Sequence, residues 1–460
     1  MIDLKLGSTS EPKTNWTEEQ LSVINSESDA ILVEALAGSG KSSTLMGLAH
    51  KYDNGLYLAF NKNIVTDIVS KLPEGWVCST FNAFGLGLIR QNQKYAKVNF
   101  GKYNRRGRRE ASQLAQSHMN LNGNSSIDSW IKTCERYRMD TELIDDAKYI
   151  LREGRMETGV ISGGDMLQYP ILNGWQSNVF DIVLIDEAQD CTPQQIKFIT
   201  KCVPNEKIVF CGDRNQSIYY FMGSEPKVFD KVIEKYNPEV LPLKQSFRCP
   251  EAIIKEANKY VPEIWSNIKG GSVNTVVKLP VEEYPEDCFI LCRVNAGLVE
   301  VANEMIQKKI RFSIGGNFVK LVKREVNAAV AGCDSVEEAI EKSKKRLNHA
   351  MSVYKKNGWS TTSLESRYET IRVVFDNYTS FLEIRDFVGK LEAHTTGSSK
   401  RRLLTGHACK GLENENVFIL NQGICHHFRS KAKSDAEKAE ELNILYVMIT
   451  RSLNNLTFVG

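Results

Sequence analysis

The chain has 460 residues, of which 42% are hydrophobic and 25% are charged. A chain of this length can bury more than one core, so several domains are expected. Its formal net charge of +3 excludes a globally basic nucleic-acid binder, although a basic groove can lie within a balanced total. The sequence shows neither the order of a signal peptide nor an apolar run of membrane-spanning length, so we expect a cytoplasmic protein without a membrane partner.

The eleven cysteines are scattered along the chain. The closest pair, Cys288 and Cys292, flanks three apolar residues in a predicted buried strand rather than in a metal knuckle. We therefore expect neither structural zinc nor a disulfide framework.

The first informative segment is "ILVEALAGSGKSSTLM", Ile31 to Met46, which predicts a strand, a turn of small residues and a helix. The glycines of the turn allow backbone N–H groups to face phosphate oxygens, Lys41 reaches the terminal phosphates, and Ser42 offers its hydroxyl to Mg²⁺. Ala35 replaces the usual first glycine of such a loop. A plain Gly/Ser turn is the alternative, but it would not require a Lys-Ser pair. The expected nucleotide contacts are Ala37, Gly38, Ser39, Gly40, Lys41, Ser42 and Ser43.

A second strand is predicted in "FDIVLIDEAQD", where an apolar run leads into Asp186 and Glu187. Both carboxylates then follow the carboxyl end of a strand, which is where open α/β sheets bind ligands. Asp186 would hold Mg²⁺, and Glu187 would activate water for attack on the γ-phosphate. The alternative is an exposed acidic loop.

Other segments follow a recognisable order. Before and between the two strands lie "NWTEEQ", "LYLAFNKN" and "TFNAFG". After them come "VFCGDRNQSIYYFMG", "LKQSFRCP", "CFILCRVNAG", "LLTGHACKGLENENVFIL" and "ELNILYVMITRS". In their joint order these blocks resemble the motifs of superfamily 1 helicases of the UvrD/Rep group, over nearly the whole chain.

The resemblance implies a catalytic set completed by two domains that close around ATP. Gln216 would sense the γ-phosphate, and Arg248 and Arg451 would bring positive charge to the transition state from the second domain. They join Lys41 and Glu187 as the expected catalytic residues. Further nucleotide contacts would come from Gln20 and Phe247, which would bind adenine, and from Glu413.

The resemblance also implies contacts to single-stranded DNA, with Phe221 as the best candidate for stacking on a base. Burial in the core is the alternative for Phe221 and for its neighbours Tyr219 and Tyr220. The expected DNA contacts are Phe60, Asn61, Thr80, Phe81, Tyr219, Phe221, Arg293, Asn295, Thr405 and His407. Lys410, Gly411 and Tyr446 belong to the same late motifs.

Several positions depart from the family pattern. Asn82 stands where histidine is common, Met222 where arginine is usual, and Asn414 where an aromatic residue is usual. Leu442 and Asn443 replace two arginines. Met222 removes one polar link between ATP and DNA, so a looser coupling of the two is expected. None of these departures removes a hydrolytic residue.

The implied fold is α/β, with two RecA-like P-loop motor domains of parallel sheets flanked by helices. Long stretches between motifs predict a mainly helical subdomain inserted in each. The expected division is motor domain 1A at 1–88 and 165–244 with insertion 1B at 89–164, and motor domain 2A at 245–320 and 399–460 with a short insertion 2B at 321–398.

Insertion 2B shows helical periodicity. Ser335 and Glu338 form a capping-box pattern ahead of one apolar face, formed by Val336, Ile340, Leu347, Met351 and Tyr354. A following helix repeats that spacing at Leu364, Tyr368, Ile371 and Phe375. In insertion 1B, the basic run Arg105 to Arg109 can grip phosphates or form a solvated loop.

The sequence therefore predicts an ATP- and Mg²⁺-dependent motor that moves 3′ to 5′ on single-stranded DNA and unwinds tailed duplex DNA in replication, recombination or repair. A translocase that mainly removes bound proteins remains an alternative. A P-loop kinase and a nucleotide-controlled switch are further alternatives, and RNA is not distinguished from DNA as the track.

Overall fold

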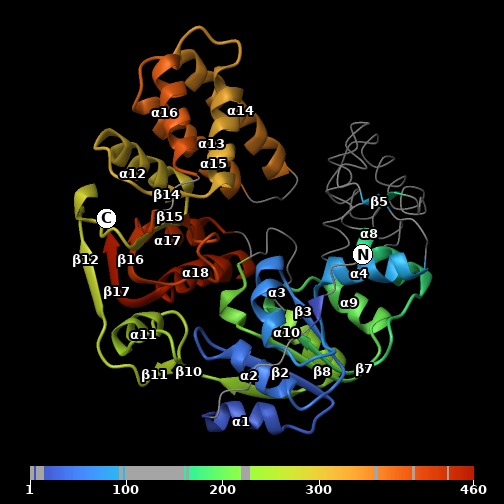
Figure 1. Cartoon of the computed structure of the whole chain (residues 1–460). Coiled ribbons are helices and arrows are strands. Elements are labelled where there is room, and N and C mark those ends of the chain that lie inside the picture. The colour runs from blue at the N-terminus through green and yellow to red at the C-terminus, as the bar shows by residue number, and fades with distance from the viewer. Residues whose placement is uncertain are drawn as a thin grey trace. The chain divides into compact units, whose positions relative to one another are not determined.

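A computed structural model of the chain describes residues 5–6, 15–92, 97–98, 160–161, 165–218, 228–356, 361–395, 399–432 and 435–460. The chain divides into two compact units, residues 1–244 and residues 245–460. Each unit contains its own main sheet, and Figure 1 labels most of the elements of both.

The first unit alternates strands and helices. Its strands are β1 (Lys5–Leu6), β2 (Ala30–Ala35), β3 (Gly55–Ala59), β4 (Val77–Thr80), β5 (Lys97–Val98), β6 (Val160–Ile161), β7 (Phe180–Ile185), β8 (Asn205–Gly212) and β9 (Glu239–Leu243). Its α-helices are α1 (Glu18–Asn25), α2 (Lys41–Ala49), α3 (Lys62–Ile68), α4 (Phe81–Asn92), α8 (Asp165–Asn173), α9 (Pro193–Cys202) and α10 (Val228–Tyr236).

Seven strands form the first sheet in the order β1-β4-β3-β7-β8-β2-β9. All neighbours are parallel except β1, which pairs antiparallel with β4. Because the three chemically important strands β7, β8 and β2 are neighbours and parallel, their carboxyl ends lie along one edge.

Helices cover both faces of this sheet. Side chains from α4, α8, α9 and α10 pack with alternate strand residues such as Leu32, Val183 and Phe210. Side chains from α1, α2 and α3 pack with the intervening residues, such as Val33 and Leu184. Burial on both faces explains why these strands are continuous apolar runs in the sequence.

The second unit also combines strands and helices. Its strands are β10 (Gln245–Ser246), β11 (Trp265–Ser266), β12 (Ser272–Val276), β13 (Cys288–Cys292), β14 (Ser313–Ile314), β15 (Arg401–Thr405), β16 (Asn414–Leu420) and β17 (Ser452–Val459). Its α-helices are α11 (Glu251–Ala257), α12 (Asn295–Gln307), α13 (Gly316–Val330), α14 (Val336–Lys356), α15 (Thr362–Asp376), α16 (Phe381–Ala393), α17 (Gly423–Lys431) and α18 (Asp435–Ile449).

Six strands of the second unit form a parallel sheet in the order β12-β17-β16-β13-β15-β14. The predicted buried strand with two cysteines is confirmed, because β13 is buried along its whole length. The described cysteines are all free thiols.

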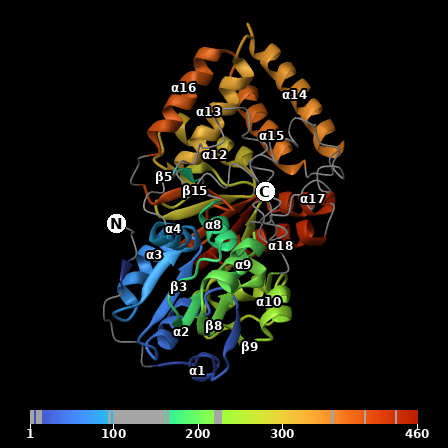
Figure 2. The same cartoon turned by 90° about the vertical axis from the view of Figure 1, so that its right-hand side faces the viewer.

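Helices α13 to α16 form a bundle between β14 and β15, which Figure 2 shows beside α12. The two helices expected from periodicity are confirmed as α14 and α15, and the Ser335 hydroxyl accepts the predicted capping bond from the Glu338 N–H at 3.2 Å. Helices α13 and α16 were not predicted individually. Side chains of the bundle, including Phe375 and Phe387, share one hydrophobic core with Leu298 of α12, so the insertion is anchored to the motor sheet.

Within the described residues, no helix is long and apolar enough to cross a membrane. The basic run Arg105 to Arg109, most of insertion 1B and the residues Tyr219, Phe221 and Met222 lie outside the described residues.

Candidate nucleotide and DNA site

The loop between β2 and α2 has the backbone shape of a phosphate cradle. Gly38 and Gly40 have φ angles of 72° and 78°, in the left-handed region that glycine enters without a Cβ clash. Helix α2 begins at Lys41, and its N-cap, Gly40, makes no side-chain capping bond. The first N–H groups of α2 are therefore presented to the loop, as anion binding requires.

A buried hydroxyl in the same loop also points to a ligand. The side-chain oxygen of Ser39 has no hydrogen-bond partner among the described residues, although the residue is only 2% exposed. A buried hydroxyl without a partner destabilises a fold unless a ligand or water pairs with it. Ser42, the expected Mg²⁺ contact, is exposed on the first turn of α2. The loop thus fits the phosphates of a nucleotide and the metal bound to them.

Asp186 is held in a fixed orientation at the end of β7. Tyr57, from the neighbouring strand β3, donates its hydroxyl to Asp186 Oδ2 at 2.7 Å, and the N–H of Glu187 donates to Oδ1 at 2.8 Å. Both Asp186 and Tyr57 are buried. A single oriented carboxylate suits Mg²⁺, which takes most of its other ligands from phosphate and water.

Glu187 follows with a strained backbone. Its φ of 51° and ψ of 43° are left-handed, which is unfavourable for a residue with a side chain. Such strain concentrates at functional sites, where the surrounding structure enforces it. The Gln189 side-chain amide donates to Glu187 Oε2 and so restrains the carboxylate.

The loop after β8 carries Gln216 and lies next to both segments. Gln216 Nε2 donates to Asp213 Oδ2 at 2.6 Å, and Asp213 Oδ1 accepts from the Asn215 N–H at 3.0 Å. The Asp213 N–H donates to Gln189 Oε1 at 3.1 Å. The expected γ-phosphate sensor is therefore connected to the segment that carries Glu187.

Charged groups that follow the three strand ends influence one another's pKa, so they lie close together. Burial raises the pKa of Asp186, and the neighbouring Glu187 carboxylate raises it further, whereas the Tyr57 hydroxyl and Lys41 lower it. Burial also raises the pKa of Asp213, and Lys41 again acts in the opposite direction. Lys41 is therefore close enough to stabilise the charged form of both carboxyl groups.

Arg214 attaches the loop that carries Gln216 to neighbouring elements of the first unit. Its guanidinium pairs with Glu34 of β2 at 2.8 Å and with Asp230 of α10 at 2.7 Å. It also lies 5.3 Å from the ring centre of Phe229. These contacts tie the loop to the strand that precedes the phosphate cradle.

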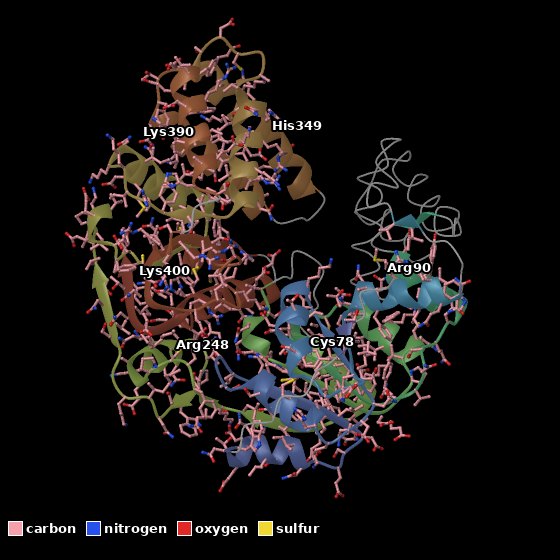
Figure 3. The ribbon with its side chains drawn as sticks, viewed as in Figure 1. Cys78, Arg90, Arg248, His349, Lys390 and Lys400 are labelled. Carbon is pink, nitrogen blue, oxygen red and sulfur yellow. The ribbon has the colours of Figure 1, made fainter. Side chains whose placement is uncertain are left out.

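In the second unit, the two predicted arginine fingers lie close to one segment. Arg248 Nε lies 2.7 Å from Glu413 Oε2, and Figure 3 labels Arg248. Arg451 donates to the backbone oxygen of Leu412, the residue before Glu413, at 3.2 Å. Burial raises the pKa of the Cys249 thiol to about 11, although Arg248 and Arg451 both act to lower it. The fold thus gathers three residues that were predicted from separate motifs.

The two predicted adenine contacts, Phe247 and Gln20, differ in how far their side chains are exposed to solvent. The Phe247 side chain is exposed, with 49% of its surface accessible, so its ring can stack on a base. Gln20 is buried and completes the capping box of α1, because its Oε1 accepts from the Thr17 N–H at 3.1 Å. That box can be recognised in the sequence as T-x-x-Q.

Two predicted DNA contacts of the first unit have clear structural roles. Phe81 is 2% exposed and packs in the core with Leu88 and Phe198, so its side chain has a structural role, and its contact with DNA stays a prediction. Asn61 caps α3, with Oδ1 accepting from the Ile64 N–H at 3.1 Å. Phe60 and Thr80 are partly exposed near the carboxyl ends of β3 and β4.

Arg293 is engaged within the second unit. Its guanidinium makes two hydrogen bonds to Glu441 of α18, at 2.7 and 2.6 Å, and lies over the Phe428 ring. The other predicted DNA contacts of this unit are partly exposed residues at or after the carboxyl ends of β13 and β15, namely Asn295, Thr405 and His407.

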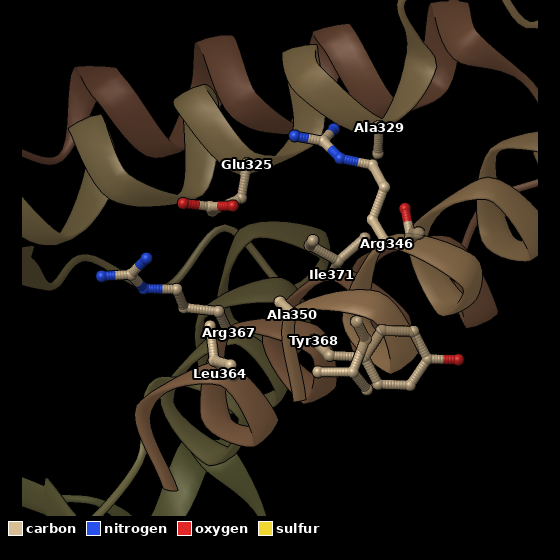
Figure 4. Close-up of a pocket in the computed structure, with 10 residues that line it drawn as sticks. Glu325, Ala329, Arg346, Ala350, Leu364, Arg367, Tyr368 and Ile371 are labelled. Carbon is tan, nitrogen blue, oxygen red and sulfur yellow. The ribbon is translucent and has the colours of Figure 1, made fainter. Parts of the chain in front are cut away.

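The helical insertion contains a separate pocket of about 200 Å³ between α13, α14 and α15. Figure 4 shows Glu325, Arg346 and Arg367 among its lining residues. None of the predicted site residues lines it, so the nucleotide site has to be located from the strand ends rather than from this pocket.

Several residues in contact with the site were not predicted, namely Tyr57, Gln189, Asp213 and Arg214. Tyr57 lies inside the quoted segment "LYLAFNKN", but its contact with Asp186 depends on the pairing of β3 with β7. Gln189 lies inside the quoted segment "DEAQD", and its position there was the available signal.

Comparison with known proteins gives two domain matches. Residues 91–237 match the UvrD/REP helicase N-terminal domain, and residues 363–459 match the UvrD-like helicase C-terminal domain.

Individual relatives carry helicase names. A probable DNA helicase II homolog of Mycoplasma capricolum is 25% identical over 62% of this chain and 56% of that protein. F-box DNA helicase protein 1 of Schizosaccharomyces pombe is 24% identical over 97% of this chain and 58% of its own length. The chain thus spans little more than half the length of these relatives. Its two domain matches, two parallel sheets and motif order show that the protein belongs to the UvrD/Rep helicase family, with those sheets as its RecA-like motor domains.

Proposed function

We propose that the protein is an ATP-dependent DNA helicase that moves 3′ to 5′ on single-stranded DNA and unwinds tailed duplex DNA in replication, recombination or repair. The observation that carries the proposal is the meeting of the phosphate cradle, Asp186 with Glu187, and Gln216 at three neighbouring strand ends. Family membership supports the DNA substrate.

In the first unit, different residues would bind the phosphates, hold Mg²⁺ and activate the attacking water. The α2 N-terminus and Lys41 bind the phosphates, and Ser42 with Asp186 would hold Mg²⁺, which neutralises phosphate charge when bound. Glu187 accepts a proton from the attacking water, and Gln216 contacts the γ-phosphate. Gln20 and Phe247 would bind the adenine.

The second unit supplies dispersed positive charge. Arg248 and Arg451 would approach the γ-phosphate when the two motor domains meet around ATP, and Glu413 would contact the nucleotide. Because these charges come from another domain, hydrolysis would open and close the cleft between the domains. We propose that this motion drives translocation.

Contacts to DNA are proposed for residues of both motor domains. The residues are Phe60, Asn61, Thr80, Phe81, Tyr219, Phe221, Arg293, Asn295, Thr405 and His407. Insertions 1B at 89–164 and 2B at 321–398 would contact duplex or tail. Helices α4 and α13 cross the proposed starts of these insertions, since α4 ends at Asn92 and α13 begins at Gly316.

The polarity of movement is tested with duplexes that carry only a 3′ tail or only a 5′ tail. We expect ATP-dependent strand separation from the 3′-tailed substrate and little from the 5′-tailed one. The blunt duplex and a reaction without ATP serve as controls. A preference for the 5′ tail would reverse the polarity, and failure on both substrates with intact DNA-stimulated ATPase activity would favour the alternative below.

The alternative is a translocase that mainly removes bound proteins. The bundle α13 to α16 makes a compact second insertion, and this favours the alternative because less surface is available to engage duplex DNA. Displacement of streptavidin from a biotinylated single strand, measured beside strand separation, distinguishes the two functions. Fast displacement with negligible strand separation would select the translocase.

Tyr57→Phe tests the orientation of the metal ligand. The lost hydrogen bond stabilises the ionised form of Asp186, so its pKa should rise further above its usual value. Since Mg²⁺ needs the ionised carboxylate, we expect the Mg²⁺ concentration for half-maximal ATPase activity to rise about 10-fold, more at mildly acidic than at mildly alkaline pH. A Mg²⁺ titration at both pH values checks this, and an unchanged titration would contradict it.

A further inference from the structure

The side chain of Gln189 connects two parts of the candidate site. It lies in the short 3₁₀ turn Ala188–Asp190 after Glu187 and is 1% exposed. Its Oε1 accepts from the Asp213 N–H at 3.1 Å, and its Nε2 donates to Glu187 Oε2. One amide group thus spans from the proposed general base to the loop that carries Gln216.

The orientation of this amide follows from its partners. A backbone N–H can only donate, so the oxygen of Gln189 has to face Asp213. The amide nitrogen then faces Glu187, whose ionised carboxylate can only accept. A flipped amide would lose both bonds in a buried place, where an unsatisfied polar group is costly.

The fit around the amide is close. A Cβ atom added at Gly212, the residue before Asp213, would lie 2.1 Å from Gln189 Oε1. A residue with a side chain does not fit at Gly212, at the end of β8, because the Gln189 amide occupies the space that the side chain would need. Asp213 in turn accepts from Gln216 Nε2 at 2.6 Å, which continues the connection to the proposed γ-phosphate sensor.

We propose that Gln189 is a positioning residue that holds the Glu187 carboxylate in its catalytic orientation and links it to the loop of Asp213 and Gln216. The inference rests on the proposed ATP hydrolysis and adds the means by which base and sensor keep their geometry. Catalysis by a general base depends on such geometry, since small displacements of a reacting group reduce turnover strongly.

Two substitutions of Gln189 test the two hydrogen bonds that its side-chain amide makes. Gln189→Met keeps the length of the side chain and removes both hydrogen bonds. Gln189→Glu keeps an oxygen for the Asp213 N–H but places a carboxylate against Glu187, where like charges repel. The matched control is Gln168→Met, which removes another buried amide of the first unit, one that accepts from Gln194 Nε2 at 3.1 Å.

The measurements are steady-state ATPase kinetics with single-stranded DNA, binding of a non-hydrolysable ATP analogue, and thermal melting. We expect both Gln189 variants to lose about 10- to 100-fold in kcat, with KM for ATP and analogue binding close to wild type. Because each variant also disturbs a buried hydrogen bond, its melting temperature should fall no further than that of Gln168→Met. Gln168→Met should keep its kcat.

Gln189→Glu tests the contact with Glu187 apart from the contact with Asp213, because it keeps an oxygen for the Asp213 N–H and puts a like charge against Glu187. Wild-type kcat in this variant would overturn the proposal. A change confined to melting temperature or to KM would also overturn it. Should Gln189→Met fail to fold, the kcat of Gln189→Glu still tests the proposal. Failure of the wild-type protein to hydrolyse ATP would instead refute the proposed function.

Discussion

Glu187→Gln is expected to reduce DNA-stimulated ATP turnover about 10²- to 10⁴-fold, the usual contribution of a general base. An amide cannot accept the proton of the attacking water, but it keeps an oxygen for the bond from Gln189. The phosphate cradle and Asp186 are unchanged, so ATP binding should persist. Steady-state ATPase assays and equilibrium binding of ATP measure the two effects separately.

The matched control for this variant is Glu206→Gln. Glu206 is an exposed carboxylate near the amino end of β8, away from the strand ends that carry the site. Its substitution should leave turnover unchanged. Wild-type turnover in Glu187→Gln would remove Glu187 from the role of base, and loss of ATP binding would show that the variant had damaged the cradle.

The parts of the fold that the sequence predicted are those encoded locally. The strand and helix around Lys41 follow from one short segment, because the turn needs small residues and the strand is buried on both faces. Helices α14 and α15 were predicted from one apolar face each. Both kinds of signal depend on residues close together in the chain.

Contacts between distant segments could not be predicted in the same way. Tyr57 reaches Asp186 only because β3 pairs with β7 in one register. Arg293 pairs with Glu441 across most of the second unit's sequence, so its motif did not reveal that partner. Phe81 packs in the core, and its motif does not say which face of α4 is buried. Long-range register and helix facing are properties of the assembled core.

Arg248→Ala is expected to reduce DNA-stimulated turnover about 10³- to 10⁵-fold, the effect of removing an arginine finger. Arg248 is the better test than Arg451. Arg451 also donates to Val447 O and Leu412 O within its own unit, so its removal would disturb folding as well. Arg248 pairs with the half-exposed carboxylate of Glu413, and an ion pair of that kind contributes about 0 to 1 kcal/mol. Thermal melting should therefore stay near wild type.

Three further variants decide what Arg248 does. Arg248→Lys should recover little activity, since a point charge does not reproduce the planar guanidinium. Lys269→Ala removes another cation of the second unit, one paired with Glu251, and should keep full turnover. Glu413→Gln tests whether Arg248 serves only to hold Glu413. If it did, the two single variants would lose turnover equally and the double variant would lose no more. A much larger loss in Arg248→Ala, with DNA binding retained, is the result that an arginine finger requires.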